Sequence, residues 1–183
     1  MPGNWGYLTN DMREYVTNTY PKDWSVLDIG CGHGHYAKLL KHHFSVKNFD
    51  GIEVWEPYIQ EYNLNNLYTN IYNVNILNFN FNYYDLIIMG DVLEHLSRDD
   101  GVNLINKLAS KCTELLVIVP YYLPQDIVND NVYEVHLQPD LDDDIMSQYY
   151  PSLELINYNN KNFKIKIDVG DKTYYYCAFR KKK

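Results

Sequence analysis

Three side chains that can move protons lie close together in the stretch GDVLEHLSRDD, residues 90–100. Asp91, Glu94 and His95 have the spacing i, i+3 and i+4, so one helical turn would place all three on the same face. A His beside a Glu can remove the proton from an attacking hydroxyl, because an unperturbed imidazole pKa of about 6.5 suits that role near neutral pH. The stretch therefore predicts a proton-transfer site, with the alternative that Glu94 and His95 only brace a loop.

His136, in the distant stretch YEVHLQPD, offers a second imidazole to this group. Carboxylate and imidazole groups are also ligands that proteins give to divalent cations. Glu94, His95 and His136 therefore indicate either a catalytic group in which His136 is a base or contacts the substrate, or a site for a divalent metal. The sequence leaves both interpretations open and assigns no metal ligands.

A glycine-rich turn follows an apolar run in VLDIGCGHGHYAKLL, residues 26–40. Gly30, Gly32 and Gly34 have the spacing G-x-G-x-G, whereas a dinucleotide fold needs G-x-G-x-x-G facing a pyrophosphate. Asp28 stands two residues before the first glycine, where its charge would repel a pyrophosphate but could hold a cationic, amino-acid-bearing ligand. The turn therefore favours a nucleoside without a diphosphate.

A second acid, Glu53 in DGIEV, comes nineteen residues after Gly34, at the end of the next apolar run. A carboxylate in that place can accept hydrogen bonds from both ribose hydroxyls. Together, Asp28 and Glu53 describe a ligand that has a ribose and an ammonium group.

Apolar runs alternate with helical patterns over the first two thirds of the chain, which predicts an α/β fold with a mostly parallel sheet covered on both sides. After residue 120 an irregular connection, residues 121–140, precedes a short helix and three alternating segments that predict antiparallel strands. The expected strands are 25–30, 48–54, 70–76, 84–90 and 114–120, and the expected helices are 9–20, 34–43, 57–63 and 98–110.

Length and composition limit the function classes. The 183 residues suit one domain, 1–183, and a net charge of −8 disfavours long nucleic acid as a partner. No run approaches the ~20 apolar residues of a membrane span, and no signal pattern precedes the first strand, so we expect a soluble, cytoplasmic protein without a membrane partner.

Three stretches, VLDIGCGHGHYAKLL, GIEVWEPYI and YDLIIMGDVLEHL, resemble motif I, the acidic loop after strand two and motif IV of class I S-adenosylmethionine-dependent methyltransferases. The resemblance covers residues 9–120 well and the rest loosely, and it is specific because three motifs fall in order at the ends of strands. It implies S-adenosylmethionine as cofactor and a Rossmann-like fold: a mostly parallel seven-stranded sheet, helices on both faces and an antiparallel C-terminal hairpin.

Carried over by position, the resemblance also implies the residues that bind the cofactor. Residues 1–20 would form an N-terminal helix and lid, and residues 121–140 a connection on the substrate side. For Trp55 and Ile76, ordinary core packing is the alternative. The methionine moiety is expected at Asp28, Gly30, Cys31 and Gly32, the ribose at Glu53, the adenine at Val54, Trp55, Asn75 and Ile76, and the transferable methyl beside Asp91.

The pattern D-x-x-E-H followed by a later His is similar to that of small-RNA 3′-end methyltransferases and ubiquinone-pathway O-methyltransferases, which position a sugar or catechol hydroxyl through a divalent cation. Asp91 stands where the RNA enzymes carry Glu, and no basic surface for RNA is evident. A metal-dependent O-methyltransferase acting on a ribose or catechol hydroxyl is therefore one alternative.

Motif IV lacks the D/N-P-P-Y/F pattern, which disfavours methylation of amino groups on DNA bases. Tyrosines and carboxamides in residues 121–140 suit a sugar. We therefore expect O-methylation of a small hydroxylated acceptor, such as a sugar or glycan component, by Glu94, His95 and His136. A non-catalytic S-adenosylmethionine-binding partner subunit is a further alternative, and the oligomeric state is not predicted.

Overall fold

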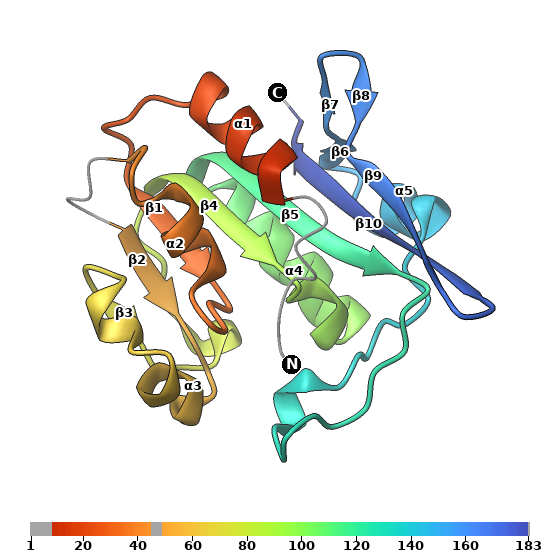
Figure 1. Cartoon of the computed structure of the whole chain (residues 1–183), viewed down its shortest axis with the longest axis horizontal. Helices are drawn as coiled ribbons and strands as arrows, with labels where there is room; N and C mark the ends of the chain where they lie inside the picture. Colours follow the sequence, from red (N-terminus) through yellow and green to blue (C-terminus); the bar gives the residue numbers. More distant parts are fainter. Residues whose placement is uncertain (1–8, 45–48, 183) are drawn as a thin grey trace.

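The computed structural model describes residues 9–44 and 49–182. Its centre is a sheet in which five strands run parallel in the order β3–β2–β1–β4–β5 (Figure 1). The order reverses between β1 and β4, since the chain first adds strands on one side of β1 and then on the other. The strands are β1 (Val26–Ile29), β2 (Phe49–Ile52), β3 (Ile71–Tyr72), β4 (Tyr84–Gly90) and β5 (Cys112–Tyr121).

The antiparallel end of the sheet corrects the expected strand count from seven to eight. β10 (Lys172–Lys181) pairs with β5 along one edge, and its other edge pairs first with β9 (Lys164–Val169) and then with β6 (Leu153–Leu155). Because β10 is ten residues long, two strands fit end to end along one side of it. The β9–β10 pair is the antiparallel C-terminal hairpin that the sequence predicts, and β7 (Asn157–Tyr158) and β8 (Lys161–Asn162) form a separate pair.

Helices cover both faces of the sheet, as the sequence predicts (Figure 1). α1 (Thr9–Thr19), α2 (His35–Leu40) and α3 (Glu56–Glu61) contribute side chains to one buried cluster, and α4 (Arg98–Ala109) and α5 (Asp143–Tyr149) to the other. The two clusters are separated only by the sheet, so each central strand is buried on both sides.

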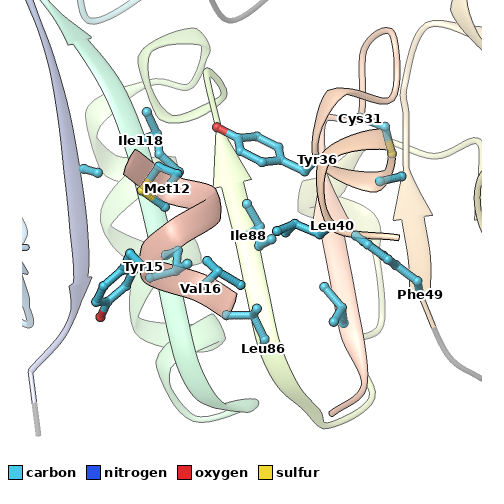
Figure 2. Close-up of a cluster of buried hydrophobic side chains, with 14 of the residues drawn as sticks. Met12, Tyr15, Val16, Cys31, Tyr36, Leu40, Phe49, Leu86, Ile88 and Ile118 are labelled. Atoms are coloured by element: carbon cyan, nitrogen blue, oxygen red, sulfur yellow. The ribbon is translucent and has the colours of Figure 1, made fainter. Parts of the chain in front are cut away.

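The side chains of β4 illustrate why the strands are so apolar. Leu86 and Ile88 belong to the cluster under α1, whereas Ile87 belongs to the cluster under α4. Figure 2 shows Met12 and Val16 of α1 beside Leu86 and Ile88. Every position of such a strand packs against a helix, which produces near-continuous apolar runs in place of alternation.

The third strand is shorter than the predicted range, 70–76. β3 covers only Ile71–Tyr72, and the chain then turns at Asn75. The Asn75 side-chain oxygen accepts the N–H of Leu77 at 2.9 Å and caps the short 3-10 turn Ile76–Asn78. Such a bond from an Asn side chain to the backbone competes with a sheet ladder, which is why Asn75 and Ile76 lie beyond the strand.

The predicted N-terminal segment 1–20 contains α1, but its residues 1–8 lie outside the described part of the chain. Among the described residues, no helix is long and apolar enough to cross a membrane. The assignment of one domain to 1–183 stays a prediction.

Gly90 ends β4 against the ring of Tyr36 from α2, and Figure 2 shows the Tyr36 hydroxyl beside the end of that strand. A Cβ at Gly90 would lie 2.5 Å from the tyrosine hydroxyl and ring. We predict that Gly90→Ala lowers the free energy of unfolding by about 1–3 kcal/mol, as in an overpacked core. In a Tyr36→Leu background the same substitution should cost close to nothing, and urea denaturation of the four proteins measures the difference. An equal cost in both backgrounds would show that Tyr36 is not the obstacle.

Candidate active site

A cavity opens at the carboxyl ends of the parallel strands, where the strand order reverses between β1 and β4. Open α/β sheets bind ligands at this position. Its empty volume is about 990 Å³, which includes the open solvent at its mouth. The loops after β1, β2, β3 and β4 line it together with the connection after β5, so segments distant in sequence meet at one site.

The glycine loop forms one wall of the cavity and folds back over the end of β2. Gly30, Gly32 and Gly34 all have positive φ, at 67°, 50° and 75°, a region that side chains disfavour. The N–H groups of Gly30 and Cys31 donate to the Ile52 carbonyl at 2.9 and 3.1 Å. The loop therefore presents backbone, rather than side chains, along this wall.

Glu53 ties the glycine loop to the start of α3. Its two carboxylate oxygens accept the N–H groups of Gly32 and Trp55, each at 2.8 Å. The side chain is only 5 % exposed and lines the cavity, and burial raises its pKa although these hydrogen bonds act in the opposite direction. The acid predicted to contact a ribose thus lies on the cavity wall.

Asp28 lies beneath the loop and is not among the residues that line the cavity. One carboxylate oxygen accepts the Tyr68 hydroxyl at 2.5 Å, and the other is buried with no partner among the described residues. Burial raises the pKa of Asp28 to about 7, although the Tyr68 hydrogen bond lowers it. Any influence of this acid on a ligand would pass through the loop above it.

Cys31 lines the cavity but its thiol points inward. Its Sγ lies 3.4 Å from the Asp28 carbonyl and 3.2 Å from the Ile52 carbonyl. Burial raises the pKa of the thiol well above its ordinary value. The thiol is therefore held as a neutral donor and is unsuited to nucleophilic chemistry.

The wall predicted for adenine is formed by Val54, Asn75 and Ile76, which all line the cavity. Trp55 does not line it, and its ring lies 6.5 Å from the ring of Tyr133 between their centroids. The structure thus brings three of the four expected residues to the cavity and turns Trp55 toward the connection after β5.

Asp91 follows β4 with a positive φ of 53°. Its backbone N–H donates to the Ile118 carbonyl at 3.0 Å, which holds the turn against β5. Both carboxylate oxygens are buried on the cavity wall without a partner among the described residues. Burial raises the pKa of Asp91, and the nearby charge of Glu134 raises it further.

Glu94, His95 and His136 come together in the structure, although Glu94 and His136 are 42 positions apart in the sequence. One ligand atom from each lies within 4.8 Å of the others. Glu94 and His95 belong to the 3-10 turn Leu93–His95, where a turn of α-helix was expected. Only His95 lines the cavity, while Glu94 and His136 lie behind it, 1 % and 8 % exposed.

The hydrogen bonds of the two histidines fix their tautomers. Nδ1 of His95 lies 3.1 Å from the Val135 carbonyl, and Nδ1 of His136 lies 2.6 Å from the Leu123 carbonyl. A carbonyl oxygen only accepts, so each Nδ1 carries the proton and each Nε2 keeps its lone pair. Burial lowers both pKa values, that of His136 to about 4, so both rings are neutral near pH 7.

Among these three residues, Glu94 is the one whose side chain has no hydrogen-bond partner in the described part of the chain. Both of its carboxylate oxygens are buried without a partner among the described residues. Burial raises the pKa of Glu94 strongly, and the charge of Asp91 raises it further. Burying an ionised carboxyl without partners is costly, so the fold favours the protonated form of Glu94.

The connection after β5 closes the cavity with residues that no sequence motif indicates individually. Asn131, Tyr133 and Glu134 line the cavity from this connection. Glu134 accepts hydrogen bonds from the Tyr58 hydroxyl at 3.1 Å and from the Gln125 side chain at 3.2 Å. The contact with Tyr58 joins the connection to α3. These three residues lie in an irregular stretch without periodicity, so no pattern in the sequence identifies them as part of the site.

Residues 26–114 match a family model described as a methyltransferase domain. No curated protein matches the chain. The match ends near the start of β5 and includes Glu94 and His95 but not His136.

Similar solved structures cover nearly the whole chain. A S-adenosylmethionine-dependent methyltransferase from Clostridium acetobutylicum ATCC 824 has a TM-score of 0.67 at 13 % identity, with 100 % of this chain and 94 % of that one covered. Magnesium protoporphyrin IX methyltransferase from Synechocystis PCC 6803, with bound SAH, has a TM-score of 0.64 at 12 % identity, with 95 % of this chain and 82 % of that one covered. The N-methyltransferase NodS from Bradyrhizobium japonicum WM9 has a TM-score of 0.59 at 14 % identity, with 97 % of this chain and 98 % of that one covered. At these identities the likeness establishes the fold.

The raised pKa of Asp28 predicts a pH-dependent penalty on stability. An unfolded Asp titrates near 3.9, and folded Asp28 near 7, so the folded state binds the proton more tightly and loses stability as pH rises from about 4 to about 7. Asp28→Asn should therefore change the free energy of unfolding more favourably at pH 8 than at pH 4. The difference between the two changes should be up to about 4 kcal/mol.

Urea denaturation at the two pH values measures this difference, and Asp126→Asn gives the effect of the same change at an exposed position. Equal effects of Asp28→Asn at both pH values would contradict the assignment.

Proposed function

We propose that the chain is a class I S-adenosylmethionine-dependent methyltransferase and that it transfers the methyl group to a hydroxyl of a small acceptor, such as a sugar or glycan component. The observation that carries this proposal is the group formed by Glu94, His95 and His136 at the edge of the cavity.

The charge of the cavity suits this cofactor. Glu53, Asp91 and Glu134 line it, and its described lining residues include no Lys or Arg. S-adenosylmethionine carries a sulfonium and an ammonium group, both of which these acids attract, whereas they would repel a pyrophosphate. The unpartnered oxygens of Asp91 fit a neighbouring positive charge in particular.

The cofactor contacts are proposed as follows. Glu53 binds the ribose, since each of its oxygens keeps a lone pair beyond the backbone N–H that it accepts. Val54, Asn75 and Ile76 border the adenine, and Asp91 lies beside the transferable methyl. The loop from Gly30 to Gly32 would hold the methionine moiety through backbone groups, with Asp28 acting from beneath.

Bound S-adenosylmethionine supplies an activated methyl group, so the protein has to align the acceptor and remove one proton. The acceptor oxygen bonds to the methyl carbon while the carbon–sulfur bond breaks and its electron pair stays on sulfur. Nε2 of neutral His95 takes the hydroxyl proton. Nδ1–H stays on the Val135 carbonyl, and Glu94 lies beside the two imidazole rings.

A divalent cation is the second candidate for the role of this group. Both histidines direct Nδ1–H to a backbone carbonyl, the usual outer contact of metal-binding histidines, and Glu94 has two unpartnered oxygens. Glu94, His95 and His136 fit a cation and would hold it through a carboxylate oxygen and two Nε2 atoms. A cation there would lower the pKa of an acceptor hydroxyl.

We predict that Glu94→Ala, His95→Ala and His136→Ala each lower kcat about 100-fold or more, as expected for the loss of acid–base catalysis. The affinity for S-adenosylhomocysteine should stay within about threefold, because the group lies outside the proposed cofactor contacts. Transfer of labelled methyl to a panel of neutral glycosides, nucleosides and catechols measures kcat, and His42→Ala is the control at an exposed histidine. Full activity of all three variants would show that the group is structural.

The cation is tested separately by calorimetry with Mn²⁺. If the group binds a cation, the wild type and His42→Ala should bind a single Mn²⁺, and His136→Ala should lose this binding. Removal of metal with a chelator should then abolish methyl transfer, and added Mn²⁺ should restore it. A rate that survives extensive chelation would exclude the cation and leave the base as the role of His95.

A further inference from the structure

Gln138 is buried between the two segments that carry the catalytic group. Its side chain is 1 % exposed, and its neighbour Leu137 is 58 % exposed, whereas His136 is again buried at 8 %. This alternation is that of extended chain, in which residues two apart face the same side. Gln138 therefore faces inward beside His136.

The polar groups of Gln138 all bind the turn that carries Glu94 and His95 or the helix behind it. Its side-chain Nε2 donates to the carbonyls of Leu93, the first residue of the turn, at 2.8 Å and of Leu96, the residue after the turn, at 3.2 Å. Its backbone N–H donates to the Glu94 carbonyl at 2.9 Å. A short 3-10 turn leaves carbonyls without a partner inside the turn. Gln138 is a donor to the carbonyls of Glu94 and Leu96, and a second donor to the Leu93 carbonyl, which also accepts the Leu96 N–H.

A second contact fixes the orientation of the Gln138 amide. The Tyr150 hydroxyl donates to Oε1 of Gln138 at 2.8 Å, so the NH₂ group must point toward the turn. Tyr150 is itself 1 % exposed at the end of α5. Gly101 of α4 leaves the space for this pair, since a Cβ there would lie 2.7 Å from the Tyr150 hydroxyl and 3.3 Å from Nε2 of Gln138.

We propose that Gln138 is a positioning residue for methyl transfer. Glu94 and His95 come from the turn after β4, and His136 from the connection after β5, so the distance between them depends on the contacts that join the two segments. The His95 ring on the Val135 carbonyl is one such contact, and Gln138 makes the others. Gln138 lies two residues after His136, and its amide joins the connection to the turn after β4 by hydrogen bonds. The Tyr150 hydroxyl orients this amide. This inference rests on the proposed role of Glu94, His95 and His136 but holds for either a base or a cation.

Only an amide of this length provides two donors and one acceptor at the same place. Gln138→Leu removes all side-chain hydrogen bonds, and Tyr150→Phe keeps the amide but releases its orientation. Tyr84→Phe is the matched control, because it removes an equally buried tyrosine hydroxyl that donates to Asp50 at 2.7 Å, away from the cavity.

The readout is the tautomer of each histidine ring in long-range ¹H–¹⁵N spectra of the labelled, chelator-treated protein. In the wild type, His95 and His136 should each show one Nδ1–H tautomer. His43 is an internal control of the opposite kind, since its Nε2 lies 2.9 Å from the Tyr20 carbonyl and carries the proton. Signals are assigned from the His95→Gln and His136→Gln variants.

In Gln138→Leu, and to a smaller extent in Tyr150→Phe, at least one of His95 and His136 should change to a mixture of tautomers, while His43 keeps its signal. Tyr84→Phe should leave all three as in the wild type. With an acceptor from the panel, kcat of Gln138→Leu should fall at least about tenfold, with KM for S-adenosylmethionine within about threefold.

Wild-type tautomers in both Gln138→Leu and Tyr150→Phe would overturn the inference, even if their melting temperatures fall, because Gln138 would then be only structural. If Gln138→Leu fails to fold, Tyr150→Phe decides. Since the tautomers are read without cofactor or acceptor, this result is independent of whether the proposed reaction is correct.

Discussion

Burial of acidic groups at one edge of the sheet is the constraint on which the site depends. Asp28, Asp91 and Glu94 each keep at least one buried carboxylate oxygen without a partner among the described residues, and the cavity lining described for the chain contains no Lys or Arg to offset them. Burying charge without compensation is costly. Burial therefore raises the pKa values of all three carboxyls and favours their protonated forms, and a ligand with positive charge would favour the ionised forms.

The parallel sheet is what gathers these groups. Because β1, β2 and β4 all end at the same edge, each places an acid or a glycine there with only a few residues of loop. The connection after β5 adds His136 and Glu134 from the other side. Gln138 binds this connection to the turn after β4, and the Tyr58 hydroxyl binds Glu134 to α3. The wall formed by Glu53 and the glycine loop is thus set by the sheet, whereas the position of His136 beside Glu94 and His95 depends on hydrogen bonds of the connection.

The sequence predicted the parallel core, and it placed Glu53 and the glycine loop at the ends of strands, because both depend on local signals: apolar runs, and acids or glycines directly after them. Glu53 and the loop from Gly30 to Gly32 lie where their spacing indicated. Features that depend on tertiary pairing were missed. β10 takes two partners on one edge, which raises the strand count to eight, and the side chain of Asn75 ends β3 early. The inward position of Asp28 and the orientation of the Gln138 amide depend on Tyr68 and Tyr150, which no spacing rule connects to them.

We expect this acidic cavity to bind a cationic methionyl nucleoside rather than a dinucleotide. Calorimetric titration of the wild-type protein with S-adenosylmethionine, S-adenosylhomocysteine and NAD measures this preference. Saturable binding of S-adenosylmethionine and S-adenosylhomocysteine, and no binding of NAD, are the expected results. Tight binding of NAD, with no heat from either methionyl nucleoside, would contradict this expectation.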